Sequence, residues 1–387
     1  MVKKTYNLDE LKSASNDLLK NKKIPTIRDE KWRYSDLDIL QSAESNKSLD
    51  AKSVVELDHA KYSIVICDGK VDDEASTLPK EYLDYTEQSE YNFDFGDGKF
   101  DSQYQVLQNY SDLKNVIQFD FQKSPNKPVE VIYSSTKAHN LFVLFSIRSG
   151  LKLSLHETFA STNNTYFNHV TKINLCEDTS LKHFKSHDFI DETKFLYSLQ
   201  LETSNNAIYN NFFVNYGIKS YRQYVNCLMY GANSIAHFYG VSIGKESEIY
   251  DVIFDIKHID SHSSSLQYYN HVFDDSSKGS FYSKIYIPNQ LHNINTQQFN
   301  QNLLLSKDAQ AFSRPELDIY SEDVKCSHGS TIGYINEDEI YYMKSRGLDE
   351  NVGKNLLIRG FLKKVFDQDE LDDEEKHLIQ SNIVKIL

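Results

Sequence analysis

Short runs of alternating apolar and polar residues dominate the chain from about residue 128 to residue 335. Examples are residues 129–133 (VEVIY), 151–155 (LKLSL) and 284–287 (KIYI). Because successive side chains of a β-strand point to opposite faces, such alternation is typical of strands with one buried face. The pattern therefore predicts a strand-rich core, which we place over residues 116–335.

Turn-forming residues punctuate the later part of this region at intervals of 13 to 18 residues. They gather near Gly231, Gly244 and residues 261–265, 276–279, 289–293, 306–308 and 321–323. A rung of that size is compatible with a parallel β-helix, whose turns bury one another's inward faces. A sandwich or barrel also has many short strands, usually with turn signals about every 8–12 residues. The pattern alone leaves both architectures open.

Helical periodicity marks the start of the chain. Asn7 can cap a helix that ends before Pro25. Its apolar face is expected to hold Leu8, Leu11, Leu18 and Leu19. Between Pro25 and residue 115 we find one short apolar strand signal, residues 63–67 (SIVIC), among long polar connections. We therefore expect an α-rich, mixed domain over residues 1–115.

Helical periodicity returns after Ile335. Asn336 is expected to begin the first C-terminal helix and Gly347 to end it. The second predicted helix carries an apolar stripe of Val352, Leu356, Leu357, Phe361 and Val365. A third is expected to contain Leu378, Ile379, Ile383 and Leu387. Residues 336–387 are thus predicted to form a C-terminal helical segment.

Composition and charge narrow the classes of function. The 26 Tyr and 22 Phe against 6 Pro favour a strand-rich globular protein, and the formal charge of −14 argues against a nucleic-acid partner. The four cysteines are far apart and form no C-x-x-C pair, so we expect reduced thiols. With no leader pattern and no apolar run long enough to span a bilayer, the expectation is a soluble, cytoplasmic protein that does not enter a membrane.

The motifs of common enzymes are missing from the sequence. Neither residues 240–246 nor residues 347–355 have the spacing of a phosphate-binding loop, and no G-x-S-x-G elbow occurs. The pairs His183/His187 and His258/His262 would each lie about 13 Å apart along a strand, so polar surface or stacking between repeats is favoured over metal binding. The sequence does not indicate an enzyme.

Cys326 and His328 are the candidate chemical site. On an extended strand both side chains point to the same face, roughly 6–7 Å apart, so a thiolate and an imidazole could meet one iron or sulfur atom. The alternative is that Cys326 is a small buried apolar residue beside a polar neighbour. Spacing alone does not separate the two interpretations.

Longer blocks around this motif resemble a known family. They are residues 28–34 (RDEKWRY), 301–306 (QNLLLS), 314–320 (RPELDIY), 323–331 (DVKCSHGST), 341–347 (YYMKSRG) and 360–366 (GFLKKVF). Together they closely resemble the SufD members of the SufB/SufD family, which are scaffold subunits of the SUF iron–sulfur cluster assembly system. The likeness covers roughly the last hundred residues and a short N-terminal patch.

The resemblance implies a mainly β fold, a right-handed parallel β-helix with an N-terminal helical domain and C-terminal helices, and so decides between the open architectures. It also implies a non-enzymatic scaffold that forms a heterodimer with SufB and docks the SufC ATPase, with Arg346, Gly360 and Phe361 in the docking segment. A transient iron–sulfur cluster would be shared with SufB, and no nucleotide would bind to this chain. A reduced flavin in the complex and a homodimer of the isolated chain are left open.

The same resemblance indicates the SufD type. SufB proteins carry an acceptor cysteine near position 300 and a glutamate after the later histidine, whereas this chain has Asn300 and Gly329. His328 is therefore expected to be a cluster and iron ligand and Cys326 an interface thiol. The rival hypothesis is a β-helix enzyme or binding protein that acts on polysaccharide. A third is a purely structural solenoid that only positions SufC.

Overall fold

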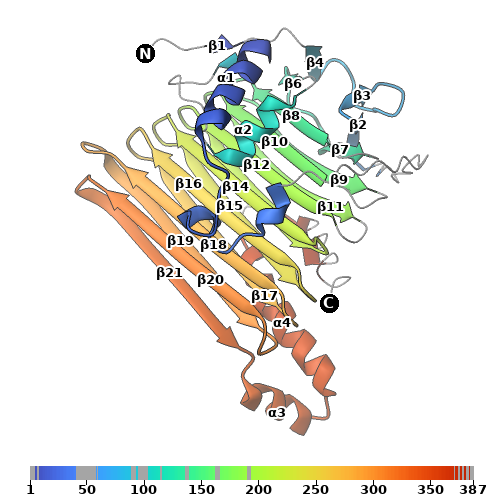
Figure 1. Cartoon of the computed structure of the whole chain (residues 1–387), viewed down its shortest axis with the longest axis vertical. Coiled ribbons are helices and arrows are strands. Elements are labelled where there is room, and N and C mark those ends of the chain that lie inside the picture. The colour runs from blue at the N-terminus through green and yellow to red at the C-terminus, as the bar shows by residue number, and fades with distance from the viewer. Residues whose placement is uncertain are drawn as a thin grey trace.

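The structure is a computed structural model in which strands dominate (Figure 1). It describes residues 5–6, 8–40, 58, 60–88, 93–94, 103–113, 116–135, 139–161, 166–189, 193–369, 371–373, 375–376, 379–380 and 383. No helix in these ranges is long and apolar enough to cross a membrane.

The helices lie near the two ends of the chain. They are α1 (Leu8–Asn21), α2 (Tyr104–Ser111), α3 (Glu337–Ser345) and α4 (Glu350–Phe366), with two 3-10 turns, η1 (Glu30–Trp32) and η2 (Leu37–Leu40). The early strands are β1 (Thr5–Tyr6), β2 (Tyr62–Cys67), β3 (Lys70–Asp72), β4 (Leu83–Gln88) and β5 (Phe93–Asp94). The repeating strands are β6 (Val116–Phe121), β7 (Val129–Ser135), β8 (His139–Ile147), β9 (Lys152–Ser161), β10 (Tyr166–Leu175), β11 (Ser180–Phe189), β12 (Lys194–Thr203), β13 (Ile208–Tyr216), β14 (Ser220–Met229), β15 (Ile235–Gly244), β16 (Ile249–His258), β17 (Ser264–Phe273), β18 (Lys278–Ile287), β19 (His292–Leu304), β20 (Gln310–Ile319) and β21 (Asp323–Tyr334).

Two sheets form the core of the molecule. The nine-stranded sheet contains the even-numbered strands from β4 to β20, and the ten-stranded sheet contains the odd-numbered strands from β7 to β21 together with β2 and β3. From β6 onward each strand pairs in parallel with the strand two places along the chain. The chain therefore winds back and forth between the sheets as a parallel β-solenoid of about seven turns. The predicted fold class, mainly β with a parallel β-helix and helices at both ends, is confirmed.

One full turn of the solenoid is longer than the repeat read from the sequence. Side chains in equivalent positions of successive turns are hydrogen-bonded across 28 residues, as between Asn206 and Asp178, or 31 residues, as between Ser265 and Thr296. The spacing of 13 to 18 residues is therefore one strand with its connection, or half a turn, and treating it as a rung was wrong. The reason is that the chain turns once at each side of the two sheets.

Helices cover the outer faces of both sheets. Leu8 and Leu11 of α1 and Val106 of α2 pack with Phe142 and Val170 on the outside of the nine-stranded sheet. On the other side, buried residues of α4 pack over the stacked rings of Phe212 and Tyr239 of the ten-stranded sheet. These helices shield outward-facing aromatic rings from water, so the sheets have apolar side chains on both faces.

The first 115 residues contribute strands to both sheets. The strand predicted at residues 63–67 is part of β2, which pairs in parallel with β7. β4 pairs antiparallel with β6. α1 ends before Pro25 and buries Leu8 and Leu11, as expected, but Leu18 is exposed, so the predicted apolar face is wrong at that position. The predicted cap, Asn7, lies outside the described residues. β2, β3 and β4 thus continue the sheets of the solenoid across the boundary at residue 115. The division into regions 1–115, 116–335 and 336–387 stays a prediction.

The C-terminal helices have the predicted ends but a different buried face. The side chain of Asn336 accepts a hydrogen bond from the Asp338 backbone N–H, and Gly347 adopts a φ of +86° after α3. In α4 the predicted stripe is wrong at Val352 and Leu356, which are exposed, whereas Phe361 is half-buried and Val365 is buried as expected. The buried positions are Gly353, Ile358, Leu362, Val365 and Phe366. Of the third predicted helix, Ile379 and Ile383 pack against α4, whereas Leu378 and Leu387 lie outside the described residues.

Candidate functional site at the open end of the solenoid

The last turn of the solenoid is an open edge. In the part of the chain that the structure describes, β20 pairs only with β18 and β21 only with β19. Each strand therefore presents one row of backbone N–H and C=O groups that no described strand covers. Such a row is a ready template for pairing with another strand.

Cys326 and His328 lie on the edge strand β21 and share the face that looks into the solenoid. Cys326 is in register with Thr296 of β19, and His328 is in register with Gln298. Both β19 residues are buried. Because side chains alternate along a strand, the odd-numbered neighbours of this pair point outward.

The two side chains differ in their surroundings. Cys326 is half-buried and packs with Val324 against the main apolar core, and this burial raises the pKa of its thiol. His328 is exposed. A raised thiol pKa keeps Cys326 protonated at neutral pH, so a metal would have to displace that proton to bind the sulfur.

The pair does not form a complete metal site within this chain. Among the described residues, no three His, Cys, Asp or Glu side chains are arranged to hold a metal ion. Iron–sulfur clusters are usually held by four ligands, mainly thiolates. Cys326 and His328 can supply at most half of such a set, and their role as ligands stays a prediction.

The three residues expected at a docking segment differ in exposure, and their role in docking stays a prediction. Arg346 caps α3, and its guanidinium lies 5.3 Å from the ring centre of Tyr342. Gly360 is exposed on α4, but Phe361 is half-buried against the ten-stranded sheet. The backbone carbonyl of Phe361 also accepts a hydrogen bond of 2.7 Å from the Asn270 side chain. Phe361 thus holds α4 onto the solenoid.

The structure contains a buried ionic cluster that the sequence pattern did not reveal. Its centre is Glu157, which is fully buried between the sheets. One carboxylate oxygen accepts hydrogen bonds from the hydroxyls of Tyr133 (2.7 Å) and Thr171 (2.9 Å), and the other accepts one from Tyr197 (2.8 Å) and lies 2.9 Å from Nε2 of His183. Burial alone would raise the pKa of this carboxyl, but hydrogen bonds and charge from nearby histidines hold it well below its usual range.

Lys185 is a buried amine close to the Glu157 carboxylate. Its Nζ donates to the side-chain oxygen of Asn215 at 2.8 Å and to the hydroxyl of Tyr221. The rings of Tyr197 and Phe213 lie 4.8 Å and 4.7 Å from Nζ and add cation–π attraction. Burial lowers the pKa of Lys185 well below its usual value, and the nearby Glu157 carboxylate opposes this effect.

A signal for this cluster was present in the sequence. His183, Lys185 and His187 occupy alternate positions of one strand, so they share a face. The structure buries all three, and His258 as well, so these histidines do not lie at a polar surface. His262 is the exception, because it is exposed in a turn.

A buried neutral histidine makes the stability of the fold depend on pH. His258 lies between the hydroxyls of Ser263 and Ser265, and burial lowers its pKa to about 4. The unfolded chain, with a histidine pKa of about 6.5, takes up the proton first. The stabilisation that comes from neutral, buried His258 is therefore fully present above pH 6.5 and is lost as the pH falls towards 4.

The parent should lose stability between pH 7 and pH 5, because His258 takes up a proton on unfolding. In a His258→Gln variant, we expect this drop in the free energy of unfolding to be about 2 kcal/mol smaller. Urea unfolding at both pH values measures this difference. His262→Gln, which changes the exposed histidine of the same segment, is the matched control and should keep the parent's pH dependence. Equal pH dependence in the parent and His258→Gln would contradict a depressed pKa.

Comparison with known proteins gives the family. The SufBD core domain of SUF system FeS cluster assembly matches residues 132–361, more than half of the chain. A SufBD family iron–sulfur cluster assembly protein of Synechocystis is 27% identical over 236 residues, which cover 58% of this chain and 52% of that protein. The iron–sulfur cluster assembly protein SufD of Escherichia coli is 26% identical over 226 residues, 56% of this chain and 51% of that protein.

A more distant match is the SufD protein of Plasmodium berghei, which is 23% identical over 280 residues, 70% of this chain and 20% of that protein. The aligned part of the chain spans about half the length of the two bacterial relatives. The matched core domain covers the solenoid from β7 onward together with α3 and most of α4. On this match and on the fold, the chain belongs to the SufB/SufD family of the SUF iron–sulfur cluster assembly system.

Proposed function

We propose that this chain is a scaffold subunit for iron–sulfur cluster assembly and that its open solenoid end meets a SufB-type partner. The observation that carries the proposal is the position of Cys326 and His328 on β21, an edge strand that no other described strand covers. The relatives named above are iron–sulfur cluster assembly proteins. A second solenoid placed against this edge would cover its free backbone groups and enclose the pair.

The chemistry of the pair supports a shared site. A thiolate and an imidazole are both ligands for iron in clusters, and two ligands from this chain leave the remaining positions to the partner. A cargo held by ligands from two chains can be released when the chains move apart. We therefore propose that His328 binds iron of the nascent cluster and that Cys326 contributes a thiolate once its proton has been displaced.

The exposed side of the C-terminal helices supports docking of a second partner, a SufC-type ATPase. Tyr341 and Tyr342 of α3 and Val352 and Leu356 of α4 are large apolar or aromatic side chains that remain exposed. Leu348, between the helices, is exposed as well. Large exposed apolar side chains on neighbouring helices are a feature of protein interfaces. Gly360 is exposed one turn after Leu356 and can belong to the same contact.

No observation favours the rival activity on polysaccharide. The matched family consists of assembly proteins. The buried carboxylate Glu157 is already satisfied by hydrogen bonds inside the solenoid, where a glycan could not reach it.

Anaerobic co-expression with SufB-type and SufC-type partners tests the proposal. We expect His328→Ala to lower the iron and sulfide content of the purified complex about tenfold, because a ligand is lost, while the three chains still purify together. The absorbance spectrum separates a cluster from a bound flavin. His292→Ala changes an exposed histidine at the start of the neighbouring strand β19 and is the matched control. Unchanged iron in His328→Ala would refute the ligand role.

The docking surface is tested in the same purification. Leu356→Asp places a charge on the exposed apolar patch and should release the ATPase while the two solenoid chains stay together. Leu18→Asp makes the same change at an exposed leucine of α1, at the other end of the chain, and serves as the control. Retention of the ATPase by Leu356→Asp would show that it docks elsewhere.

A further inference from the structure

A segment near the N-terminus crosses the outer face of the nine-stranded sheet almost to its open edge. We call residues 26–40, which include η1 and η2, the strap (Figure 1). At one end Lys194 of β12 donates to the Asp38 carbonyl, and at the other Arg314 of β20 forms an ion pair with Glu30. The strap therefore joins strands that belong to five successive turns.

The middle of the strap is anchored by buried groups. The ring of Trp32 lies under the guanidinium of Arg222 of β14, with 3.4 Å between the guanidinium carbon and the ring centre. Arg222 also donates to the Lys31 carbonyl at 2.9 Å and to the Ser35 hydroxyl at 2.7 Å, and it forms an ion pair with Asp251 of β16. All these contacts lie on the outer face of the sheet, at the inner strands β14 and β16, and they fix the strap in place.

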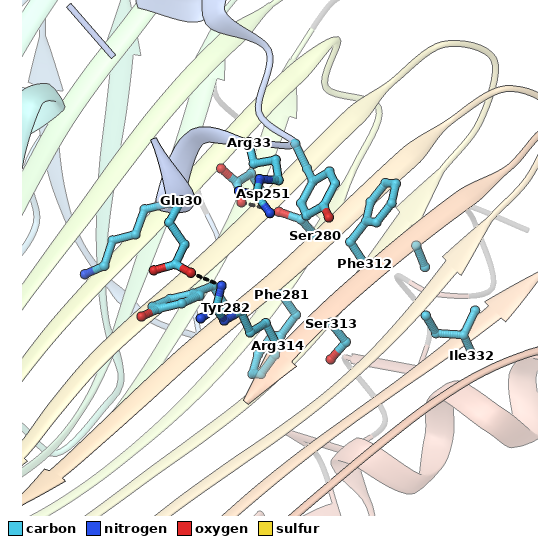
Figure 2. A pocket seen from close by; sticks show the side chains of 13 residues that line it. Glu30, Arg33, Asp251, Ser280, Phe281, Tyr282, Phe312, Ser313, Arg314 and Ile332 are labelled. Carbon is cyan, nitrogen blue, oxygen red and sulfur yellow. Dashed lines mark hydrogen bonds and ion pairs between the residues drawn. The ribbon is translucent and has the colours of Figure 1, made fainter. Parts of the chain in front are cut away.

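The contacts of the strap with β20 are of a different kind. Tyr34 stacks on Phe312 with ring centres 3.7 Å apart and planes 6° apart, and Glu30 pairs with Arg314. Glu30 and Arg314 are each about half exposed. Figure 2 shows Glu30, Arg314 and Phe312 around a pocket of about 360 Å³, with Ile332 of β21 on its far side. The strap thus contacts β20 of the last turn, and Ile332 of β21 lines the same pocket.

We infer that the strap is a brace for the last turn of the solenoid and that Glu30, Tyr34 and Arg314 are positioning residues for the edge. A terminal strand has a hydrogen-bonded neighbour on one side and is prone to local opening. The strap connects β20 to an anchor on β14 and β16, which lie inside the sheet. Opening β20 therefore requires breaking the contacts of Tyr34 and Glu30 as well as the ladder to β18.

By holding β20, the strap also restrains β21, the strand that carries Cys326 and His328. Leu317 and Ile319 of β20 and Val324 and Cys326 of β21 pack against one apolar core. Ile332, on the same face of β21 as Cys326 and His328, lines the strap pocket. Loss of the brace should therefore loosen both strands. The consequence for cluster content rests on the proposed function, whereas the brace itself does not.

Hydrogen exchange of the full-length chain, followed by mass spectrometry, tests the brace. Tyr34→Ala should speed exchange of the β20 and β21 amides roughly tenfold and leave β8 to β12 unchanged, since stacking and ion pairing are lost only at the edge. Tyr34→Phe retains the ring and should behave as the parent. Unchanged exchange in Tyr34→Ala, or equal acceleration in all strands, would overturn the inference.

The ion pair is tested by a double-mutant cycle. Glu30→Gln and Arg314→Gln should each speed exchange in β20, and the double variant should be no faster than the faster single variant. Arg148→Gln removes a comparable ion pair with Asp120 at the other end of the same sheet and should leave β20 and β21 as in the parent. Fully additive effects of the two substitutions would show that Glu30 and Arg314 do not act together.

Cluster content separates the brace from the proposed function. In the co-expressed complex, Tyr34→Ala should lower iron and sulfide while Tyr34→Phe does not. If exchange in the edge strands accelerates and cluster content stays unchanged, Tyr34 does not position the pair. If the parent complex holds no cluster, the proposed function fails, and the exchange rates still decide the brace.

Discussion

Glu157→Gln is expected to lower the free energy of unfolding by about 3–5 kcal/mol, the range measured when one member of a buried charged pair is removed. The substitution keeps the shape of the side chain but replaces one acceptor oxygen by a donor. That donor must face either Tyr133 and Thr171 or Tyr197 and His183. Lys185 also loses its nearby counter-charge in the interior. Urea denaturation at pH 7 measures the change.

The control for this prediction is the same chemical change at the surface. Glu81→Gln removes a carboxylate whose partner, Lys123, is also well exposed. Ion pairs of that kind contribute less than about 1 kcal/mol because water screens both charges. If the two variants were equally stable, the interior of the solenoid would have to be accessible to water around Glu157.

Arg222→Met is expected to cost a similar amount, about 3–5 kcal/mol, for a related reason. Arg222 is buried, and its loss leaves the Asp251 carboxylate in the sheet without a cation. The indole of Trp32 and the carbonyl of Lys31 lose their partner at the same time. Thermal and urea unfolding both report the loss, and the strap should become accessible to limited proteolysis.

Replacing the carboxylate as well should recover much of that loss. A buried ion pair that is exchanged for two apolar side chains is often neutral, whereas a lone buried charge is not. The double variant Arg222→Met, Asp251→Leu should therefore be more stable than Arg222→Met alone. A double variant that is less stable than both singles would show that Asp251 is held mainly by the hydroxyls of Ser35 and Ser280.

Periodicity in the sequence predicted the strand-rich core and several of its strands and helices, but not the length of one turn of the solenoid. Strand alternation correctly located β7, β9 and β18, and the caps at Asn336 and Gly347 correctly located α3. The length of a solenoid turn could not be read in the same way. Turn residues look alike at both sides of the two sheets, so the sequence shows half-turns of nearly equal length.

Alternation also left open which face of a strand is inside. His183, Lys185 and His187 share a face, and polar residues at alternate positions are usually placed towards water. Here that face points between the sheets, where Glu157 of the preceding turn is in register with Lys185 and lies 2.9 Å from Nε2 of His183. The partner lies about one turn away in the sequence, at a distance set by the register and not by any local pattern.

The buried face of α4 could not be predicted from the sequence for a similar reason. It carries apolar residues on two sides, and the side with Val352 and Leu356 faces away from the solenoid. Local periodicity identifies an apolar face but does not say whether the rest of the chain or another protein covers it. For Cys326 and His328, the strand pattern correctly put both on one face, while their place at the end of the stack required the whole fold.

The winding of the chain makes this protein a linear stack in which each turn contacts only the turn before it and the turn after it. An inner turn is stabilised across two interfaces, but the turn formed by β20 and β21 has one. Melting should therefore begin at an end of the stack and travel inward, and at this end it must also break the contacts of the strap with β20. A second solenoid added there would convert the terminal turn into an inner one, so association would raise the midpoint of the first melting step without altering any contact within the stack.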